Sequence, residues 1–236
     1  METDHRLIKE GGATGRSSTG GWMRRAGVLL LLSFAAGCAV TQQSTPEPVV
    51  EQPPVVEKKT IERLDGGRMG FIITETADPS AAWRGDFERA AHLMQDSGDA
   101  EAIPILEEIV RQSPGVTAPY INLAMAYRHT EQFGLAEEQL QAALQLVPDH
   151  PVANNEYGLL LRQTGRFKEA REVYEATLLM FPEYLPVRLN LGILCELYLS
   201  DNACALEQYV TYSEANPDDD VVALWLAGLK LRMGHN

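Results

Sequence analysis

The feature that most constrains the fold is an internal repeat that runs from residue 83 to residue 219. Alanines at one position of the repeat are 34, 34 and 35 residues apart, and prolines at a second position keep the same intervals. The residues that mark the period are Ala102, Ala136, Ala170 and Ala205, and Pro114, Pro148, Pro182 and Pro217. A fixed period of this length indicates one supersecondary unit stacked on itself. It predicts units at 83–116, 117–150, 151–184 and 185–219, the last with one extra residue near 200–202.

Each unit has the hydrophobic spacing of two helices. In unit 117–150, Tyr120, Leu123, Ala124 and Tyr127 follow the i, i+3, i+4, i+7 spacing of a first helix. A second helix follows, and small residues such as Ala124 and Ala136 let the two helices approach closely. The proline at the end of the unit stops the second helix because it has no amide donor. One helix pair cannot bury its apolar side alone, so the pattern predicts a stacked array.

A 34-residue unit with these small residues and a terminal proline resembles the tetratricopeptide repeat. This resemblance implies an all-α fold, a right-handed α-solenoid of about four helix pairs. Residues 220–236 are predicted to form a C-terminal capping helix with Leu224 and Trp225 among its apolar residues. The aspartates at 218–220 complement the positive end of the helix dipole. A calcium site at these aspartates is the alternative.

Residues 1–37 have the pattern of a signal peptide. The basic stretch Met23–Arg25 precedes an apolar run of eleven residues, 26–36, which is too short to cross a bilayer as a helix, for which about 20 residues are needed. A basic start, a short apolar core and small residues at the end are typical of a secretory signal. Residues 1–22 are polar, and Met23 is an alternative start of the chain.

The sequence A-A-G-C that ends at Cys38 resembles the lipobox of bacterial lipoproteins. The resemblance implies cleavage before Cys38 and acylation of its thiol and new amino group, which together would anchor the chain in a membrane. Ala39 stands where an aspartate marks retention at the inner membrane, so the resemblance implies the periplasmic face of the outer membrane. A cleaved signal with an unmodified cysteine is the alternative.

Residues 38–82 are predicted to form a tether. Proline-rich residues 41–60 contain the sequence Pro-Val-Val-Glu twice and favour an extended, semi-rigid spacer. A proline-rich ligand for a partner is the alternative. Residues 70–74 form a short apolar run that indicates a strand without a local pairing partner. Such a strand would lie against the helical array or add to the sheet edge of a partner.

Two cysteines flank the turn inside the fourth unit. Cys195 is late in the first helix of that unit and Cys204 is early in the second. Antiparallel helices could bring their Cα atoms within bridging distance, about 4.4–6.8 Å. The predicted oxidising compartment would permit a disulfide. Two buried free thiols are the alternative.

The composition and motifs argue against catalysis and against nucleic-acid binding. The formal net charge is −13 and the pI is about 4.8, whereas a nucleic-acid binder needs a basic face. The histidines are scattered, and the chain has no glycine-rich phosphate loop, zinc-protease motif or nucleophile elbow. We therefore expect no enzyme activity, no metal, no cofactor and no small-molecule substrate.

The remaining candidate is a protein-binding groove. In tetratricopeptide arrays, first-helix side chains that are not used in packing line the concave groove. The corresponding residues in this sequence are Arg84, Phe87, Met94, Ile121, Met125, Arg128, Asn155, Leu159, Arg162, Leu189, Ile193 and Glu196. The set is largely apolar and suits a helix or an extended peptide. Arg128 and Arg162 are equivalent residues of neighbouring units and together could hold a carboxylate of the partner.

Two functions follow from these features. The first is a lipid-anchored scaffold that supports assembly of an envelope machine, and similar lipoproteins include the pilotins of type IV pilus secretins and members of secretion and energy-transducing complexes. The second is an adaptor that docks or regulates a peptidoglycan hydrolase. The apolar groove favours the first, because an amphipathic helix or a hydrophobic tail fits such a surface.

Overall fold

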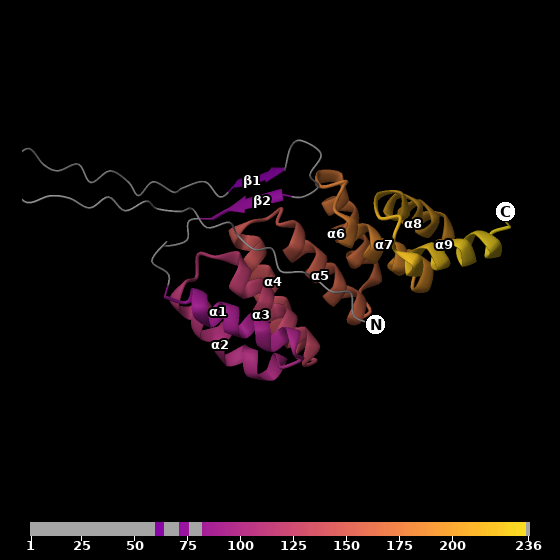
Figure 1. Ribbon diagram of the computed structural model, residues 1–236. Coiled ribbons are helices and arrows are strands. Elements are labelled where there is room, and N and C mark those ends of the chain that lie inside the picture. Colours follow the sequence, from indigo (N-terminus) through magenta and orange to yellow (C-terminus); the bar gives the residue numbers. More distant parts are fainter. Residues whose placement is uncertain (1–59, 64–70, 76–81, 235–236) are drawn as a thin grey trace, which may run out of the picture. The chain divides into compact units, whose positions relative to one another are not determined.

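The computed structural model describes residues 60–63, 71–75 and 82–234, which all belong to one compact unit, Gln52–Asn236 (Figure 1). The described residues contain a short hairpin followed by nine helices. Their bounds are β1 Thr60–Arg63, β2 Phe71–Thr74, α1 Arg84–Gln95, α2 Asp99–Gln112, α3 Thr117–His129, α4 Phe133–Leu146, α5 Pro151–Gln163, α6 Phe167–Met180, α7 Leu185–Leu197, α8 Asn202–Ala215 and α9 Asp220–Arg232. The predicted signal segment, Cys38 and residues 39–59 of the predicted tether lie outside the described residues.

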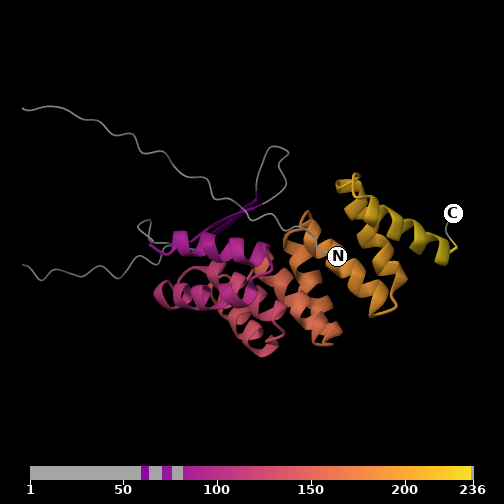
Figure 2. The ribbon, with the colours of Figure 1, turned by 60° about the horizontal axis from the view of Figure 1, so that its bottom comes forward.

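The helices form four successive pairs, α1/α2, α3/α4, α5/α6 and α7/α8, and α9 packs on the last pair (Figures 1 and 2). We call α1, α3, α5 and α7 the A helices and α2, α4, α6 and α8 the B helices. Each B helix buries its period-marking alanine completely, as at Ala102 and Ala170. The fold is therefore an all-α solenoid, as the sequence predicts.

Two A helices carry a glycine where the partner B helix inserts a tyrosine. A Cβ atom at Gly158 would lie 2.2 Å from the Tyr174 ring, and a Cβ atom at Gly192 would lie 2.5 Å from the Tyr209 ring. Both rings are buried in the core between the helices. The small residue predicted to permit close approach thus makes room for one particular side chain.

The strand at Phe71–Thr74 has a local partner that the sequence analysis missed. β1 and β2 pair antiparallel, with Thr60 opposite Thr74 and Ile61 opposite Ile73. The prediction of a lone strand is therefore wrong, and Thr60, placed in the tether, belongs to β1. The sequence T-I-E-R offers only one apolar residue, which is too few for alternation to reveal a strand.

The hairpin lies along the turns that connect successive helix pairs. Phe71 contacts the turn before α7, with its ring centroid 5.7 Å from that of Phe181 and 5.3 Å from that of Tyr184. The Glu75 carboxylate accepts the Thr117 backbone amide at the start of α3, at 3.1 and 3.0 Å. A carboxylate at this place satisfies a free amide of the helix and complements its dipole.

The last helix buries one side and exposes apolar residues on the other. Val222 and Leu229 of α9 are buried, whereas Leu224 is 72% and Leu231 is 70% exposed. A terminal helix usually keeps an array soluble with a polar outer face, and α9 lacks one. Asp219 is the N-cap of α9, and its carboxylate accepts the Val222 amide at 3.1 Å and the Tyr212 hydroxyl at 3.0 Å. Among the described residues, no helix has both the length and the apolar character needed to span a membrane.

Candidate partner-binding face

The A helices present a largely apolar row of side chains. Six of the predicted groove residues are half-buried and keep part of their surface accessible. They are Phe87, Met94, Met125, Leu159, Leu189 and Ile193. We call these six residues, together with Arg162, the A-helix face. Arg84, at the start of α1, is exposed.

Two predicted groove residues are buried and cannot serve a partner. Ile121 is 4% exposed and packs with Ala143 and Ala153, and Asn155 is 1% exposed. Asn155 accepts a hydrogen bond from the side-chain amide of Asn190 at 2.9 Å. These positions are covered because neighbouring A helices pack directly on one another, which the helical period within one unit does not reveal.

Arg128 is already neutralised within the protein. Its guanidinium lies 3.1 Å from the carboxylate of Glu156, and the two side chains are 12% and 3% exposed. It also donates to Gln163 at 3.4 Å. The prediction that Arg128 and Arg162 together hold a partner carboxylate is therefore wrong for Arg128. The signal that could have revealed this pair is Glu156, an acid where the neighbouring units have Asn122 and Asn190.

Within the described part of the chain, Arg162 has no such partner. Its guanidinium lies over the Tyr198 ring, with Cζ 5.9 Å from the centroid. The Nη1 atom is buried and has no hydrogen-bond partner among the described residues. Glu196, the equivalent residue of the next unit, accepts the Tyr209 hydroxyl at 2.9 Å and is paired with Arg232.

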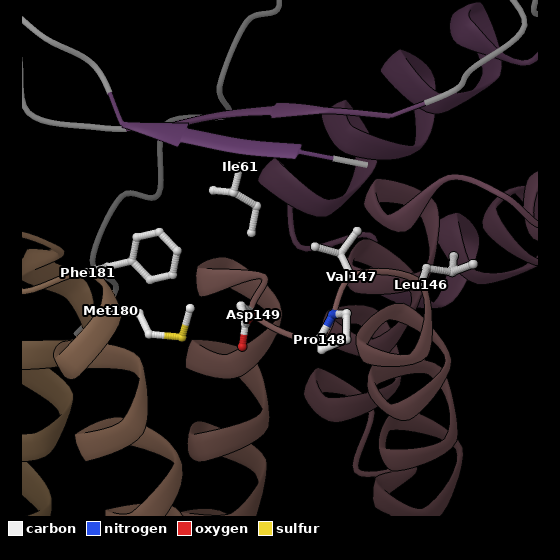
Figure 3. A pocket seen from close by; sticks show the side chains of 7 residues that line it. All are labelled: Ile61, Leu146, Val147, Pro148, Asp149, Met180 and Phe181. Atoms are coloured by element: carbon white, nitrogen blue, oxygen red, sulfur yellow. The ribbon is translucent and has the colours of Figure 1, made fainter. Parts of the chain in front are cut away.

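Two cavities formed by the described residues lie at the turns and not on the A-helix face. One of about 390 Å³ lies beneath Ile61 of the hairpin, with Val147, Asp149 and Phe181 in its wall (Figure 3). The second, of about 310 Å³, adjoins it along α6. Six of the seven residues that line the first cavity are apolar, and Asp149 is the one acid among them.

Cys195 and Cys204 are joined by a disulfide, with Cα atoms 5.9 Å apart. Asp201 lies beside them and completes a group of three possible metal ligands whose ligand atoms lie within 4.8 Å of one another. Metal ligation by cysteine needs a thiolate, which a disulfide does not offer. The Asp201 carboxylate instead accepts the Cys204 amide at 3.0 Å and pairs with Arg171 at 2.9 Å. Asp201 therefore caps α8 and links it to α6.

Burial in the helix array shifts the pKa values of two tyrosines and one histidine. Burial raises the pKa of the Tyr174 and Tyr209 hydroxyls, so both tyrosines are neutral at physiological pH. Burial lowers the pKa of His150 from its usual 6.5 to about 4. The neutral imidazole of His150 is the N-cap of α5, where Nδ1 accepts the Ala153 amide at 3.3 Å. These shifts accompany helix packing and capping.

Comparison with known proteins agrees with the repeat assignment. The sequence profile of the tetratricopeptide repeat matches residues 121–184. PilF of Pseudomonas aeruginosa has a similar structure, with 23% identity and a TM-score of 0.59 over 64% of this chain and 69% of that chain. PilW, a widely conserved type IV pilus biogenesis factor, has 21% identity and a TM-score of 0.59 over 67% of this chain and 72% of that chain.

A thermophilic tetratricopeptide-repeat protein of Thermus thermophilus is also similar, with 19% identity and a TM-score of 0.57 over 65% of this chain and 84% of that chain. At these identities the likeness concerns the fold. The helix pairs, their period and these matches lead to one conclusion: residues 121–184 match the tetratricopeptide-repeat family, and the fold of the described residues is similar to those of PilF and PilW.

Proposed function

We propose that this protein is a scaffold, anchored by lipid at the periplasmic face of the outer membrane, that binds a protein partner on the A-helix face. In this proposal it supports assembly of an envelope machine, and a type IV pilus secretin is the first candidate. The single observation that carries the proposal is the row of half-buried apolar side chains on successive A helices.

The chemistry of the A-helix face supports a protein ligand. Met125 has an unbranched, polarisable side chain that adapts to different apolar shapes, and Leu159 is its equivalent in the next unit. A continuous row of this kind fits the apolar side of an amphipathic helix or the alternate side chains of an extended peptide. The perturbed groups of the array are used in packing and capping, which suits a non-catalytic role.

The envelope location is supported by the sequence before the array. Two or more acyl chains at Cys38 would give stable anchoring, whereas one chain gives only marginal membrane binding. The proline-rich residues 41–59 would then hold the array away from the bilayer. The similarity in fold to PilF and PilW supports the pilus as the first machine to test.

The choice of machine is tested in a strain that lacks the gene. We expect fewer secretin multimers, or multimers outside the outer membrane, and recovery when the complete chain is supplied. Multimers of unchanged amount and location would reject the pilus assignment. Altered wall fragments together with copurification of a peptidoglycan hydrolase would favour the adaptor function instead.

The A-helix face is tested by crosslinking in cells. A photoreactive residue at Met125 or Leu159 should capture the same partner, because both positions belong to one row of the A-helix face. Leu179 on α6 is the matched control, since it is an 85% exposed apolar residue of a B helix. Equal capture from Leu179 would refute a role specific to the A-helix face.

A further inference from the structure

The repeat offers an internal comparison for Arg162. Arg128 of α3 pairs with Glu156 of α5, and the two residues are 28 positions apart in the sequence. The same step from Arg162 of α5 leads to Asn190 of α7. The array therefore has two equivalent arginine positions, and only the first has a carboxylate opposite it.

Asn190 does not replace that carboxylate. Its side-chain amide donates to Asn155 at 2.9 Å and carries no charge. Two other acids of the A helices, Glu156 of α5 and Glu196 of α7, are already engaged, because Glu156 is paired with Arg128 and Glu196 is paired with Arg232. Arg162 is thus a cation of the A-helix face without an ion-pair partner among the described residues, and its Nη1 atom has no acceptor.

The surroundings favour a planar anion at this place. The Tyr198 ring lies against the guanidinium and restricts its orientation. A guanidinium recognises a carboxylate through two parallel hydrogen bonds.

We propose that Arg162 binds a carboxylate group of an acidic segment of the partner, in the role that Glu156 has at Arg128. This inference rests on the proposed function and specifies the chemistry of the ligand. The apolar residues of the A-helix face would bind the rest of the segment, and Arg162 would fix its register, because an arginine left without an acceptor in a half-buried place is costly.

The test uses the complete chain labelled with nitrogen-15 and short capped peptides as probes. Acetyl-Leu-Glu-Leu-amide should shift the side-chain Nε signal of Arg162 in a saturable manner. Acetyl-Leu-Gln-Leu-amide should bind at least about tenfold more weakly, since it lacks the charge-assisted hydrogen bonds. Acetyl-Leu-Leu with a free terminal carboxylate distinguishes a side-chain carboxylate from a chain terminus as the preferred source.

The decisive variant is Asn190→Glu, which places an internal carboxylate at the position that Glu156 has relative to Arg128. It should fold, abolish the response to the glutamate peptide and resist denaturation at least as well as the parent. Asn190→Gln is its uncharged control and should keep the response, and Arg162→Gln should lose it. Equal binding of the glutamate and glutamine peptides, or an undiminished response in Asn190→Glu, would overturn the proposal. If a photoreactive residue at Met125 captured a partner but the glutamate peptide gave no response, carboxylate binding by Arg162 would be rejected. The proposed scaffold function would not be affected by that result.

Discussion

At the residue scale, the helix pairs differ in how two facing positions share volume. Gly158 faces Tyr174 and Gly192 faces Tyr209, whereas the equivalent residues of the second unit are Ala124 and Leu140. A larger residue on the A helix thus accompanies a smaller one on the B helix. Close packing to the density of an organic crystal leaves no room to enlarge one partner alone.

Gly158→Ala should destabilise the protein although alanine is the better helix former. The new Cβ atom would lie 2.2 Å from the Tyr174 ring, and overpacking of this kind costs about 1–3 kcal/mol. Gly134→Ala in α4 is the matched control, because nothing lies within 4 Å of its Cβ position. Urea unfolding measures both, and the control should lose no stability, because alanine is the better helix former and its Cβ atom meets nothing at this position. A stabilised Gly158→Ala would contradict the packing argument.

The double variant Gly158→Ala with Tyr174→Leu recreates the Ala124 and Leu140 combination. It should recover part of the loss that the glycine variant shows, because the smaller side chain vacates the space that Cβ needs. A double-mutant cycle should therefore give a coupling of about 0.5–3 kcal/mol. Strict additivity of the two changes would show that the residues do not compete for the same volume.

His150 should make stability depend on pH. Its pKa is about 4 in the folded protein, against a usual value of 6.5 when unfolded, because burial disfavours the charged ring. The unfolded chain therefore takes up the proton first, and stability falls as the pH drops from 6.5 towards 4, by up to about 3 kcal/mol. Above pH 6.5 the imidazole is neutral in both states and this contribution is complete.

His150→Asn is the variant that isolates this effect. Asparagine keeps an acceptor at the N-cap of α5 and does not titrate. The free energy of unfolding, measured between pH 7 and pH 5, should change less in the variant than in the parent, whatever the absolute stability of each. Equal slopes in the two proteins would exclude His150 as the source.

The A-helix face was only partly predictable from the sequence. The repeat located its apolar row, because one period places equivalent residues on the same side of successive helices. It did not reveal the burial of Ile121 and Asn155, which depends on how one A helix packs on the next. The ion pair between Arg128 and Glu156 was missed for the same reason, since it joins two units and occurs at one repeat boundary only.

At the element scale, the helices were predictable and the hairpin was not. A strongly periodic pattern repeated four times defines both helices of every unit and the turns between them. β1 has four residues and a single apolar side chain, so its existence depends on pairing with β2 and on contacts with the array. Strand formation of this kind is decided by packing more than by intrinsic preference.

The disulfide should stabilise the α7/α8 pair. It closes a short loop of the chain, with a sequence separation of 9 residues, for which loop entropy gives a stabilisation of about 3 kcal/mol. The double variant Cys195→Ala and Cys204→Ala should therefore have a free energy of unfolding lower by about 3 kcal/mol. Asp201 should still cap α8 in this variant. Reductant should destabilise the parent and not the double variant. Reduction of the disulfide should raise the mass of the parent protein by that of two hydrogen atoms. An unchanged mass would show that the disulfide is absent.

At the scale of the whole molecule, the hairpin departs from the rule that each repeat contacts only its neighbours. Its residues reach the turn before α7 through Phe71 and the start of α3 through Glu75, and Ile61 lies over the turn between α4 and α5 (Figure 3). In a simple solenoid, stability is a sum of repeat and nearest-neighbour terms. Because the hairpin contacts three connections between helices, it should couple the stabilities of repeat units whose helices do not contact one another.

Phe71→Ala should therefore reduce the cooperativity of unfolding more than it reduces the stability of any one helix pair. Hydrogen exchange followed by mass spectrometry should show faster exchange in β1 and β2 and at the turns around Thr117 and Tyr184. Exchange in the middle of α5 should change little, because its amides remain inside the helix and the array. The matched control is Ile72→Ala, which alters a 52% exposed side chain on the other side of the same strand. If hydrogen exchange at the turns were the same in both variants, the hairpin would not couple the repeat units. The arrangement of the array would then be set by helix packing alone.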